Sequence, residues 1–128
     1  MTDRMLRAIA NPFVDIIGHP TGRILLRRDP YKLDVSRLFD AAVEAGVALE
    51  INCQAHRLDL SDANAKAARD RGARIVISTD SHATAGFRLM QWGVQVARRA
   101  WLTKEDVLNT RDANGFKAAL RRNEKRRT

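Results

Sequence analysis

The sequence predicts an α/β fold in which parallel strands alternate with helices. Three short apolar stretches carry this prediction, at residues 13–18, 47–51 and 74–78. A helix-like segment precedes each of them and a polar loop follows, so the same order recurs three times within roughly 80 residues. Strands that are apolar on both faces and separated by helices are typical of a parallel sheet. With 128 residues, the chain is long enough for one small domain or for part of a larger one.

Hydrophobic periodicity predicts the helices between these strands. The first covers residues 3–10 and ends before an Asn-Pro pair. The second has apolar residues at helical spacing, namely Val35, Leu38, Phe39, Ala42 and Val43. Asp34 is suited to cap the start of this helix and Gly46 to end it, and Ser61 and Gly72 are suited to bound the third helix in the same way.

The last third of the sequence has a weaker pattern. Residues 85–92 can form a short helix, whereas residues 94–100 fit a helix or a strand. A capping pattern at residues 103–106 predicts a helix start, and the apolar positions of residues 114–122 predict a final helix.

Composition and charge restrict the class of protein. Hydrophobic residues make up 45% and charged residues 30%, which is ordinary for a globular chain. Cys53 is the single cysteine, so neither a disulfide framework nor a multi-cysteine zinc site can form within one chain. The sequence has no apolar run of the roughly 18 residues that a membrane span needs, and it has no apolar signal core. We therefore expect a cytoplasmic protein without a membrane partner.

The net charge of +8 is concentrated in a basic tail at residues 117–128, which holds six basic residues and one acid. Such a tail is compatible with nucleic acid or another polyanion as partner. The alternative, which charge alone favours, is a solvated helix end.

Polar side chains follow each predicted strand. They are His19 after the first strand, Glu50 and Asn52 at the end of the second, and Asp80 and His82 after the third. Because the carboxyl ends of parallel strands meet at one edge of a sheet, we expect these residues to converge.

Asp80 and His82 form the most specific pair. A carboxylate and an imidazole two residues apart point the same way if the backbone is extended, so the pair can hold one metal ion, with His19 as a third ligand. Imidazole and carboxylate suit Zn²⁺, Mn²⁺ or Fe²⁺. The alternative is that Asp80 caps a helix and His82 lies on the surface.

The other candidates leave alternatives open. Glu50, inside an apolar strand, requires either a metal or a buried arginine partner. Cys53 is expected to be a small buried thiol rather than a ligand, and His56 to be exposed. Arg23 and Arg57 lie nearest the strand ends and are suited to grip phosphate, whereas the nearby Arg27 and Arg28 are expected only to solvate a loop.

Three segments, residues 15–23, 49–52 and 78–82, resemble the later motifs of the PHP (polymerase and histidinol phosphatase) metallo-phosphoesterases. Residues 57–60 and 93–109 are similar to the C-terminal PHP domain of bacterial family X DNA polymerases in particular. The resemblance covers nearly all of residues 1–128 and implies part of a distorted (β/α) barrel. It also implies hydrolysis of phosphoesters, as in the 3′–5′ exonuclease activity and DNA repair functions of that family.

The resemblance implies roles for individual residues. His19, Asp80 and His82 correspond to metal ligands, with Asp80 and His82 as catalytic residues and Mn²⁺ or Zn²⁺ as the cofactor. Arg23, Asn52 and Arg57 correspond to neighbours of the substrate, which is expected to be DNA. Glu50 is not among these correspondences, and its place inside the second strand makes it a candidate to support the ligands.

The sequence also departs from the family pattern. The opening H-x-H motif is absent, the chain has three histidines in all, and a complete barrel needs about 200 residues or more. We therefore expect a C-terminal part of a larger enzyme, inactive or nearly so alone, with the missing part of the barrel or a second copy of itself as partner. The alternatives are a non-catalytic basic nucleic-acid-binding module and a small-molecule phosphatase of the histidinol phosphatase type.

Overall fold

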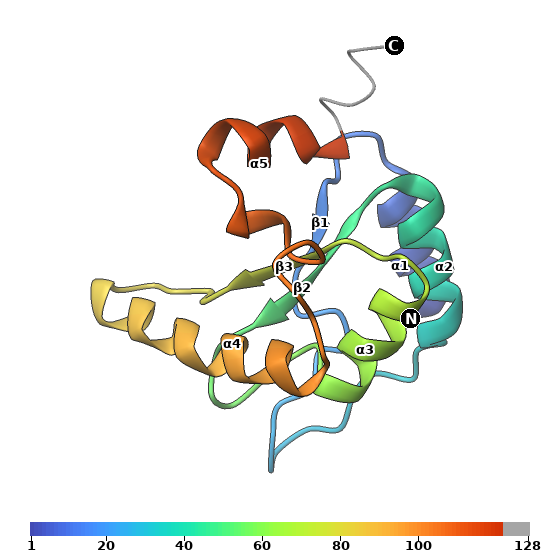
Figure 1. The fold of residues 1–128 in the computed structure, drawn as a ribbon. Helices are drawn as coiled ribbons and strands as arrows, with labels where there is room; N and C mark the ends of the chain where they lie inside the picture. The colour runs from blue at the N-terminus through green and yellow to red at the C-terminus, as the bar shows by residue number, and fades with distance from the viewer. Residues whose placement is uncertain (122–128) are drawn as a thin grey trace.

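The computed structural model describes residues 1–121 and confirms the α/β class. Three strands, β1 (Ile16–Ile17), β2 (Ala48–Asn52) and β3 (Ile75–Ser78), form a sheet in the order β1-β2-β3. Both strand pairs are parallel, with Ile17 opposite Leu49 and Asn52 opposite Ser78. The sheet is open, as expected of part of a (β/α) barrel (Figure 1).

Helices alternate with the strands. They are α1 (Thr2–Ala10), α2 (Val35–Ala45), α3 (Asp62–Asp70), the 3₁₀ helix η1 (Thr84–Leu89), α4 (Met90–Arg99), the 3₁₀ helix η2 (Leu108–Thr110) and α5 (Ala113–Ala119). The helix predicted over residues 114–122 corresponds to α5. Most of the basic tail at residues 117–128 lies outside the described residues, as does position 122.

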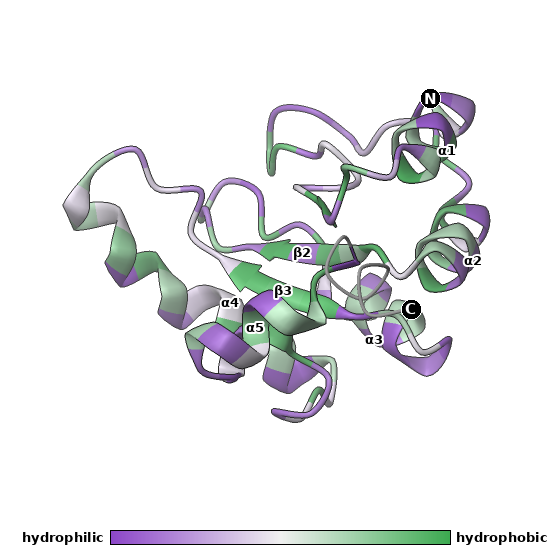
Figure 2. Cartoon of the chain, turned by 90° about the horizontal axis from the view of Figure 1, so that it is seen from above, coloured by the Kyte–Doolittle hydropathy of each residue, from purple (hydrophilic) through white to green (hydrophobic). Residues whose placement is uncertain are grey.

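The two faces of the sheet differ in composition because alternate residues of a strand point to opposite sides. The face with Ile17, Leu49, Ile51, Ile75 and Ile77 packs against apolar residues of α1, α2, α3 and α4 and forms the main core. Figure 2 shows apolar β2 and β3 between helices whose outer sides are hydrophilic.

The opposite face carries smaller and more polar side chains. Ala48 and Val76 form a second, smaller core with Leu108 of η2 and Ala119 of α5. Farther along the strands, towards their carboxyl ends, the same face carries Glu50. The fold thus separates a packed end of this face from a polar end.

The predicted helix caps are confirmed. The Asp34 side chain accepts a hydrogen bond from the Arg37 N–H at the start of α2, and Gly46 ends this helix with φ of 69°. The Ser61 hydroxyl accepts from the Asn64 N–H at the start of α3. These local contacts fix where the chain leaves each helix and enters the following strand.

Two details differ from the prediction, and one open alternative is decided. The strand expected over residues 13–18 is paired only at Ile16 and Ile17. Residues 94–100, which fitted either element, belong mainly to α4. The helix expected from Thr103 does not form. Asp106 does accept capping hydrogen bonds from the Thr103 N–H and hydroxyl at 2.7 and 3.1 Å, but Val107 pairs with Ile75 as an extended residue and ends the turn.

The outer edge of β3 is covered, unlike that of β1. Val107 forms a parallel bridge with Ile75. The Asn109 side-chain amide then accepts from the Ile77 N–H at 3.0 Å and donates to the Ile77 carbonyl at 2.7 Å. Within residues 1–121, no strand lies on the outer side of β1. None of the helices in this range combines the length and apolar character that crossing a bilayer requires.

Candidate active site at the carboxyl ends of the strands

The parallel register brings the ends of β1, β2 and β3 to one edge of the sheet, as the sequence predicted. At this edge, hydrogen bonds link four of the predicted site residues, which are His19, Glu50, Asn52 and Asp80. His82 lies two residues after Asp80 on the same loop.

Glu50 is the centre of this network. The residue is 7% exposed, and its Oε2 accepts from the His19 N–H at 2.5 Å and from Asn52 Nδ2 at 3.2 Å. Oε1 accepts from the Ser78 hydroxyl. The sequence suggested a metal or a buried arginine as its partner, but within residues 1–121 the hydrogen bonds come from a backbone amide, an amide side chain and a hydroxyl. Ser78 was missed, although its place at the end of a predicted strand was a signal.

Asn52 joins the ends of two strands. Its side chain is fully buried, and Nδ2 donates to both Glu50 Oε2 and Asp80 Oδ2 at 3.2 Å. Its Oδ1 accepts from the Gln54 N–H at 3.0 Å. Because the amide lies between two carboxylates, it reduces their repulsion and fixes one oxygen of Asp80. Asn52 was predicted as a neighbour of substrate, and its visible contacts are those of a positioning residue.

Asp80 does not adopt the extended backbone on which the sequence argument relied. Its φ is 48°, in the left-handed region that non-glycine residues rarely occupy. The Gln54 side chain supports this turn by donating to the carbonyls of Thr79 and Asp80 at 2.6 and 3.1 Å. Asp80 and His82 are therefore related by a turn of the loop, and the expectation based on an extended segment was wrong.

His82 is exposed, but its ring is oriented by the same turn. Nδ1 lies 2.9 Å from the Asp80 carbonyl oxygen. Since a carbonyl can only accept, Nδ1 carries the proton, and the lone pair is left on Nε2. Histidines that bind metals commonly have this arrangement, with one ring nitrogen donating to a carbonyl and the other available.

The donor atoms at this edge do not complete a metal centre. Within residues 1–121 there is no group of three or more His, Cys, Asp or Glu side chains that could hold a metal ion. Asp80 and His82 are suitable in type, since carboxylate and imidazole bind Mn²⁺ and Zn²⁺. The structure does not add His19 to them as a third ligand, and the contact it shows for His19 is that of its backbone N–H with Glu50. The described residues thus offer donor atoms of a type suited to these metals, but too few of them to complete a metal centre.

A hollow of about 380 Å³ opens beside Asp80 and His82. Other residues that line it are Gln54, His56, Arg57 and Leu89. Nη1 of Arg57 is buried and has no hydrogen-bond partner among the described residues. A buried donor without a partner is costly. Because Arg57 also lines the hollow, its guanidinium charge is suited to an anion bound there. His56 is exposed, as predicted.

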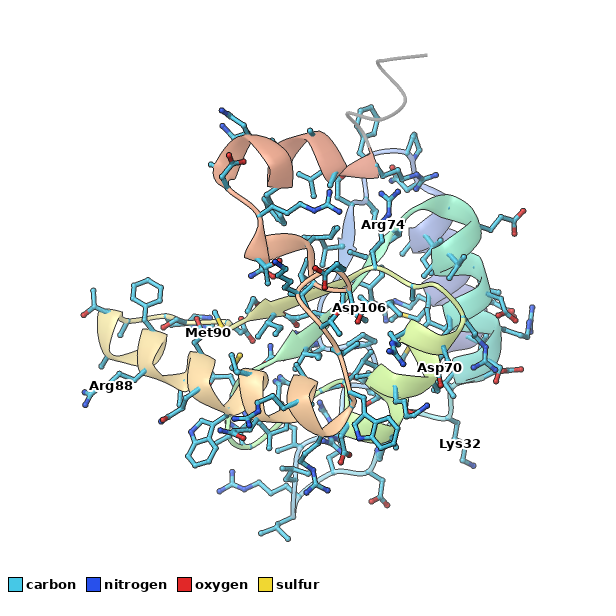
Figure 3. The ribbon with its side chains drawn as sticks, in the orientation of Figure 1. Lys32, Asp70, Arg74, Arg88, Met90 and Asp106 are labelled. Atoms are coloured by element: carbon cyan, nitrogen blue, oxygen red, sulfur yellow. The ribbon has the colours of Figure 1, made fainter. Side chains whose placement is uncertain are left out.

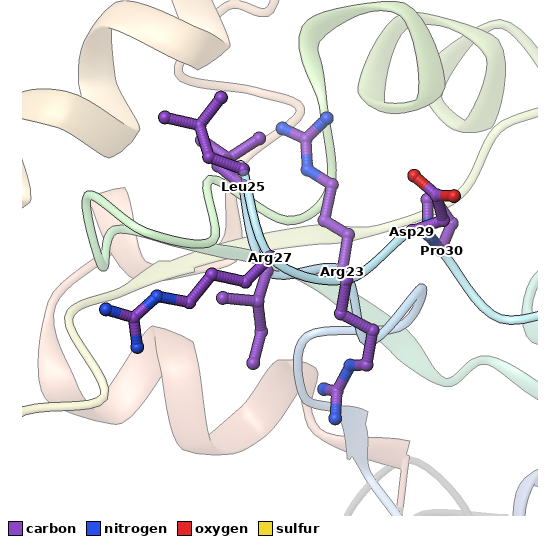
Figure 4. Close-up of a pocket in the computed structure, with 8 residues that line it drawn as sticks. Arg23, Leu25, Arg27, Asp29 and Pro30 are labelled. Carbon is purple, nitrogen blue, oxygen red and sulfur yellow. The ribbon is translucent and has the colours of Figure 1, made fainter.

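Arg23 stabilises the loop that follows β2. Its Nε donates to the Arg57 carbonyl at 2.8 Å, and its Nη2 donates to the Leu58 carbonyl. Arg23 thus holds the loop that carries Arg57. Residues 23–30 line a second hollow of about 420 Å³, and Figure 4 shows Arg27 and Asp29 extending to opposite sides of this loop.

Asp59 is a buried acid that the sequence argument overlooked. It is fully buried, and its Oδ2 accepts from the N–H groups of Thr21 and Gly22 at 3.0 and 2.8 Å. Burial raises the pKa of Asp59 above its usual value, although these hydrogen bonds oppose the shift. The sequence feature that could have indicated a buried acid is the position of Asp59 between Leu58 and Leu60.

Cys53 is buried and free, as predicted. Burial raises the pKa of its thiol to about 11. The group is therefore protonated at neutral pH and is not available as a thiolate ligand.

Comparison with known proteins shows relatives of two kinds, and no family model matches the chain. The DNA polymerase/3′-5′ exonuclease PolX of Bacillus subtilis (strain 168) is 39% identical over 121 residues, which are 94% of this chain and 21% of PolX. A probable phosphatase of Thermoanaerobacter sp. (strain X514) is 33% identical over 115 residues, covering 85% of this chain and 44% of that protein. A probable phosphatase of Shewanella sp. (strain ANA-3) is 33% identical over 114 residues, covering 84% and 43%.

The chain therefore spans about a fifth of PolX and less than half of each phosphatase. Most of its length is similar to a segment of proteins whose names describe phosphatases and a polymerase with exonuclease activity.

Proposed function

We propose that this chain is a segment of a metal-dependent phosphoesterase of the PHP family, resembling the 3′–5′ exonuclease domain of bacterial family X DNA polymerases. Two kinds of observation support the proposal. The relatives combine polymerase/exonuclease and phosphatase names and match most of the chain. The carboxyl edge of the parallel sheet carries a carboxylate, an imidazole and a guanidinium around one hollow, as is typical of phosphoester chemistry.

The observation that carries the proposal is the arrangement of Asp80, His82 and Arg57. Asp80 has one oxygen fixed by Asn52, and His82 has Nε2 available because Nδ1 faces a carbonyl. Arg57 has a buried N–H that lacks a partner among residues 1–121. A phosphate in the hollow would receive charge-assisted hydrogen bonds from Arg57, while the lone pair of His82 Nε2 would be available to a metal ion.

The same observations support an incomplete centre. We infer that Mn²⁺ or Zn²⁺ binds tightly only when further ligands, from the remaining part of the polypeptide or a partner, join Asp80 and His82. Structural metal sites generally need about four protein ligands and catalytic sites about three. The proposed substrate is DNA and the proposed compartment is the cytoplasm, where a nucleic-acid substrate would be met.

The experiment measures metal content and hydrolysis in the same preparation. The purified chain is dialysed against Mn²⁺ or Zn²⁺ and then incubated with a 3′-labelled DNA strand. We expect weak metal uptake and little or no turnover. Addition of the other part of a PHP barrel should raise both. Robust turnover by the chain alone would contradict the incomplete centre.

Matched variants identify the residues. Asp80→Asn and His82→Ala should abolish the residual metal uptake, whereas His56→Ala, which changes an exposed histidine of the same hollow, should retain it. Unchanged metal content in Asp80→Asn and His82→Ala, with DNA binding intact, would favour a non-catalytic nucleic-acid-binding module. Preference for a small phosphomonoester over DNA in the completed enzyme would favour a phosphatase like the probable phosphatases among the relatives.

A further inference from the structure

The segment from residue 83 to residue 104, which contains η1 and α4, has an unusual charge. It holds four basic residues and no acid, although 15 acidic residues occur in the whole sequence. The basic residues are Arg88, Arg98, Arg99 and Lys104. Within residues 1–121, Arg88 and Arg98 form no ion pair, whereas Arg99 contacts Asp62 at 2.8 Å and Lys104 lies 3.9 Å from Glu105. The surface therefore presents uncompensated positive charge.

Large aromatic side chains are exposed in and beside the same segment. The protein has only four Phe, two Trp and one Tyr. Of these, Phe87, Trp92 and Trp101 are 66%, 46% and 70% exposed. The Trp101 ring lies 5.9 Å from Lys66 Nζ of α3. Exposed aromatic rings in a segment that also carries cations without ion pairs favour a binding surface over a solvated helix.

The burial pattern of α4 fixes which side faces outward. Gly93, Val96 and Ala97 are buried against the sheet. The opposite side carries Arg98, and Trp92 is exposed at the border between the two sides. At a rise of 1.5 Å per residue, Trp92 and Arg98 are separated by about 9 Å along the axis, which is roughly the length of three stacked bases. Figure 3 shows Arg88 at the outer end of this segment, pointing away from the sheet.

From this combination we infer that the outer surface of η1 and α4 binds single-stranded nucleic acid, with bases stacked on Trp92 and phosphates contacted by Arg88 and Arg98. Aromatic stacking combined with a positively charged surface is the general mode of sequence-tolerant single-strand binding. The lack of acidic residues in this segment, together with two guanidinium groups that form no ion pair within residues 1–121, suits a polyanionic partner.

The surface also adjoins the candidate active site. Gly86 and Leu89 of η1 line the hollow that contains Asp80 and His82. A strand on α4 could therefore continue into that hollow. This continuation rests on the proposed function, whereas binding along α4 depends on neither metal nor hydrolysis.

The test measures oligonucleotide binding by the Asp80→Asn variant in the presence of EDTA. Neither metal binding nor hydrolysis is needed under these conditions, so the result does not depend on the proposed catalytic function. The probe is a short oligo-deoxythymidylate, titrated while tryptophan fluorescence is recorded. We expect quenching, and Trp92→Phe should keep most of the affinity while Trp92→Ala weakens it by about tenfold or more. Circular dichroism verifies that the variants fold.

The salt dependence of binding distinguishes phosphate contacts made by this surface from contacts made by positive charge elsewhere on the protein. For single strands, each neutralised phosphate contributes about 0.7 to the slope of log affinity against log salt. The double variant Arg88→Gln/Arg98→Gln should therefore lower the slope by about 1.4. Its matched control, Arg4→Gln/Arg7→Gln, removes the same charge from α1, which lies far from α4 (Figures 1 and 2), and should leave the slope unchanged.

The inference is overturned if Trp92→Ala binds as tightly as its parent, or if both double variants change the slope equally. It is also overturned if the parent binds no oligonucleotide and self-associates in sedimentation experiments through the same residues. In that case α4 would be a protein interface.

Discussion

Replacement of Asn52 by alanine tests whether the polar edge of the sheet is held together by one buried amide. The side chain makes three hydrogen bonds, to Glu50, to Asp80 and from the Gln54 N–H. It is fully buried, so water cannot replace these contacts without local rearrangement. We expect Asn52→Ala to destabilise the fold and to release the Asp80 loop.

The size of the effect follows from the charge of the partners. A hydrogen bond to a charged group contributes about 1.5–3 kcal/mol and one between neutral groups about 1 kcal/mol. Two of the three bonds of Asn52 reach carboxylates, so the expected loss is about 4 kcal/mol at the lower end of these ranges. For a domain with a stability of about 5–15 kcal/mol, this is a large fraction.

The assay is urea unfolding followed by circular dichroism. Asn114→Ala is the matched control, because it removes the same atoms from an exposed position of α5, and it should change stability by less than about 0.5 kcal/mol. A loss of less than about 1 kcal/mol for Asn52→Ala, or equal losses for the two variants, would refute the view that this amide supports both carboxylates.

Three further predictions follow from single contacts. Gly93→Ala should cost about 1–3 kcal/mol in urea unfolding, because the added Cβ would collide with Cys53 Sγ and lie 2.6 Å from Ile77 Cγ2. Asn109→Ala should cost about 2 kcal/mol and increase aggregation in light scattering, because both backbone groups of Ile77 lose their partner. Burial raises the pKa of Asp59, so the folded state retains a proton that the unfolded state has lost, and stability should fall as the pH rises from 3.8 through the raised pKa. Unfolding measured across this range should lack that fall in Asp59→Asn, and an identical pH profile would contradict the assignment.

Most of the framework could be predicted because it depends on local patterns. The periodicity of α2 and the caps at Asp34 and Ser61 act within a few residues, and the structure has them where the sequence placed them. The extent of β1 could not be predicted, because strand length depends on neighbours. Phe13 is 79% exposed, and no strand pairs with the outer side of β1 within residues 1–121.

Residues 94–100 show a limit of pattern analysis. Val94 and Val96 alternate as in a strand, yet they also fit a helix, and close packing of Gly93 on the sheet accompanies the helix. At residues 103–106 the capping pattern is present, but the pairing of Val107 with Ile75 requires extended chain immediately afterwards. In both segments, contacts with distant parts of the chain determine the secondary structure.

The candidate site was predictable in its residue types and its place. Parallel strand ends must share an edge, so Glu50, Asn52 and Asp80 could be expected together. The hydrogen bonds between these residues could not be predicted. They depend on loop conformation, as do the left-handed turn at Asp80 and its support by Gln54. Asp59 was overlooked for the same reason, since its partners at Thr21 and Gly22 are distant in sequence.

The unequal borders of the sheet limit how the described part of the chain can associate. A sheet that could be extended on both sides would permit open-ended stacking of copies into fibres. Here the Asn109 amide occupies the backbone groups that a neighbour of β3 would need, so further strands can join only beside β1. Association through strand pairing should therefore stop after a single event, yielding one pair instead of a growing polymer.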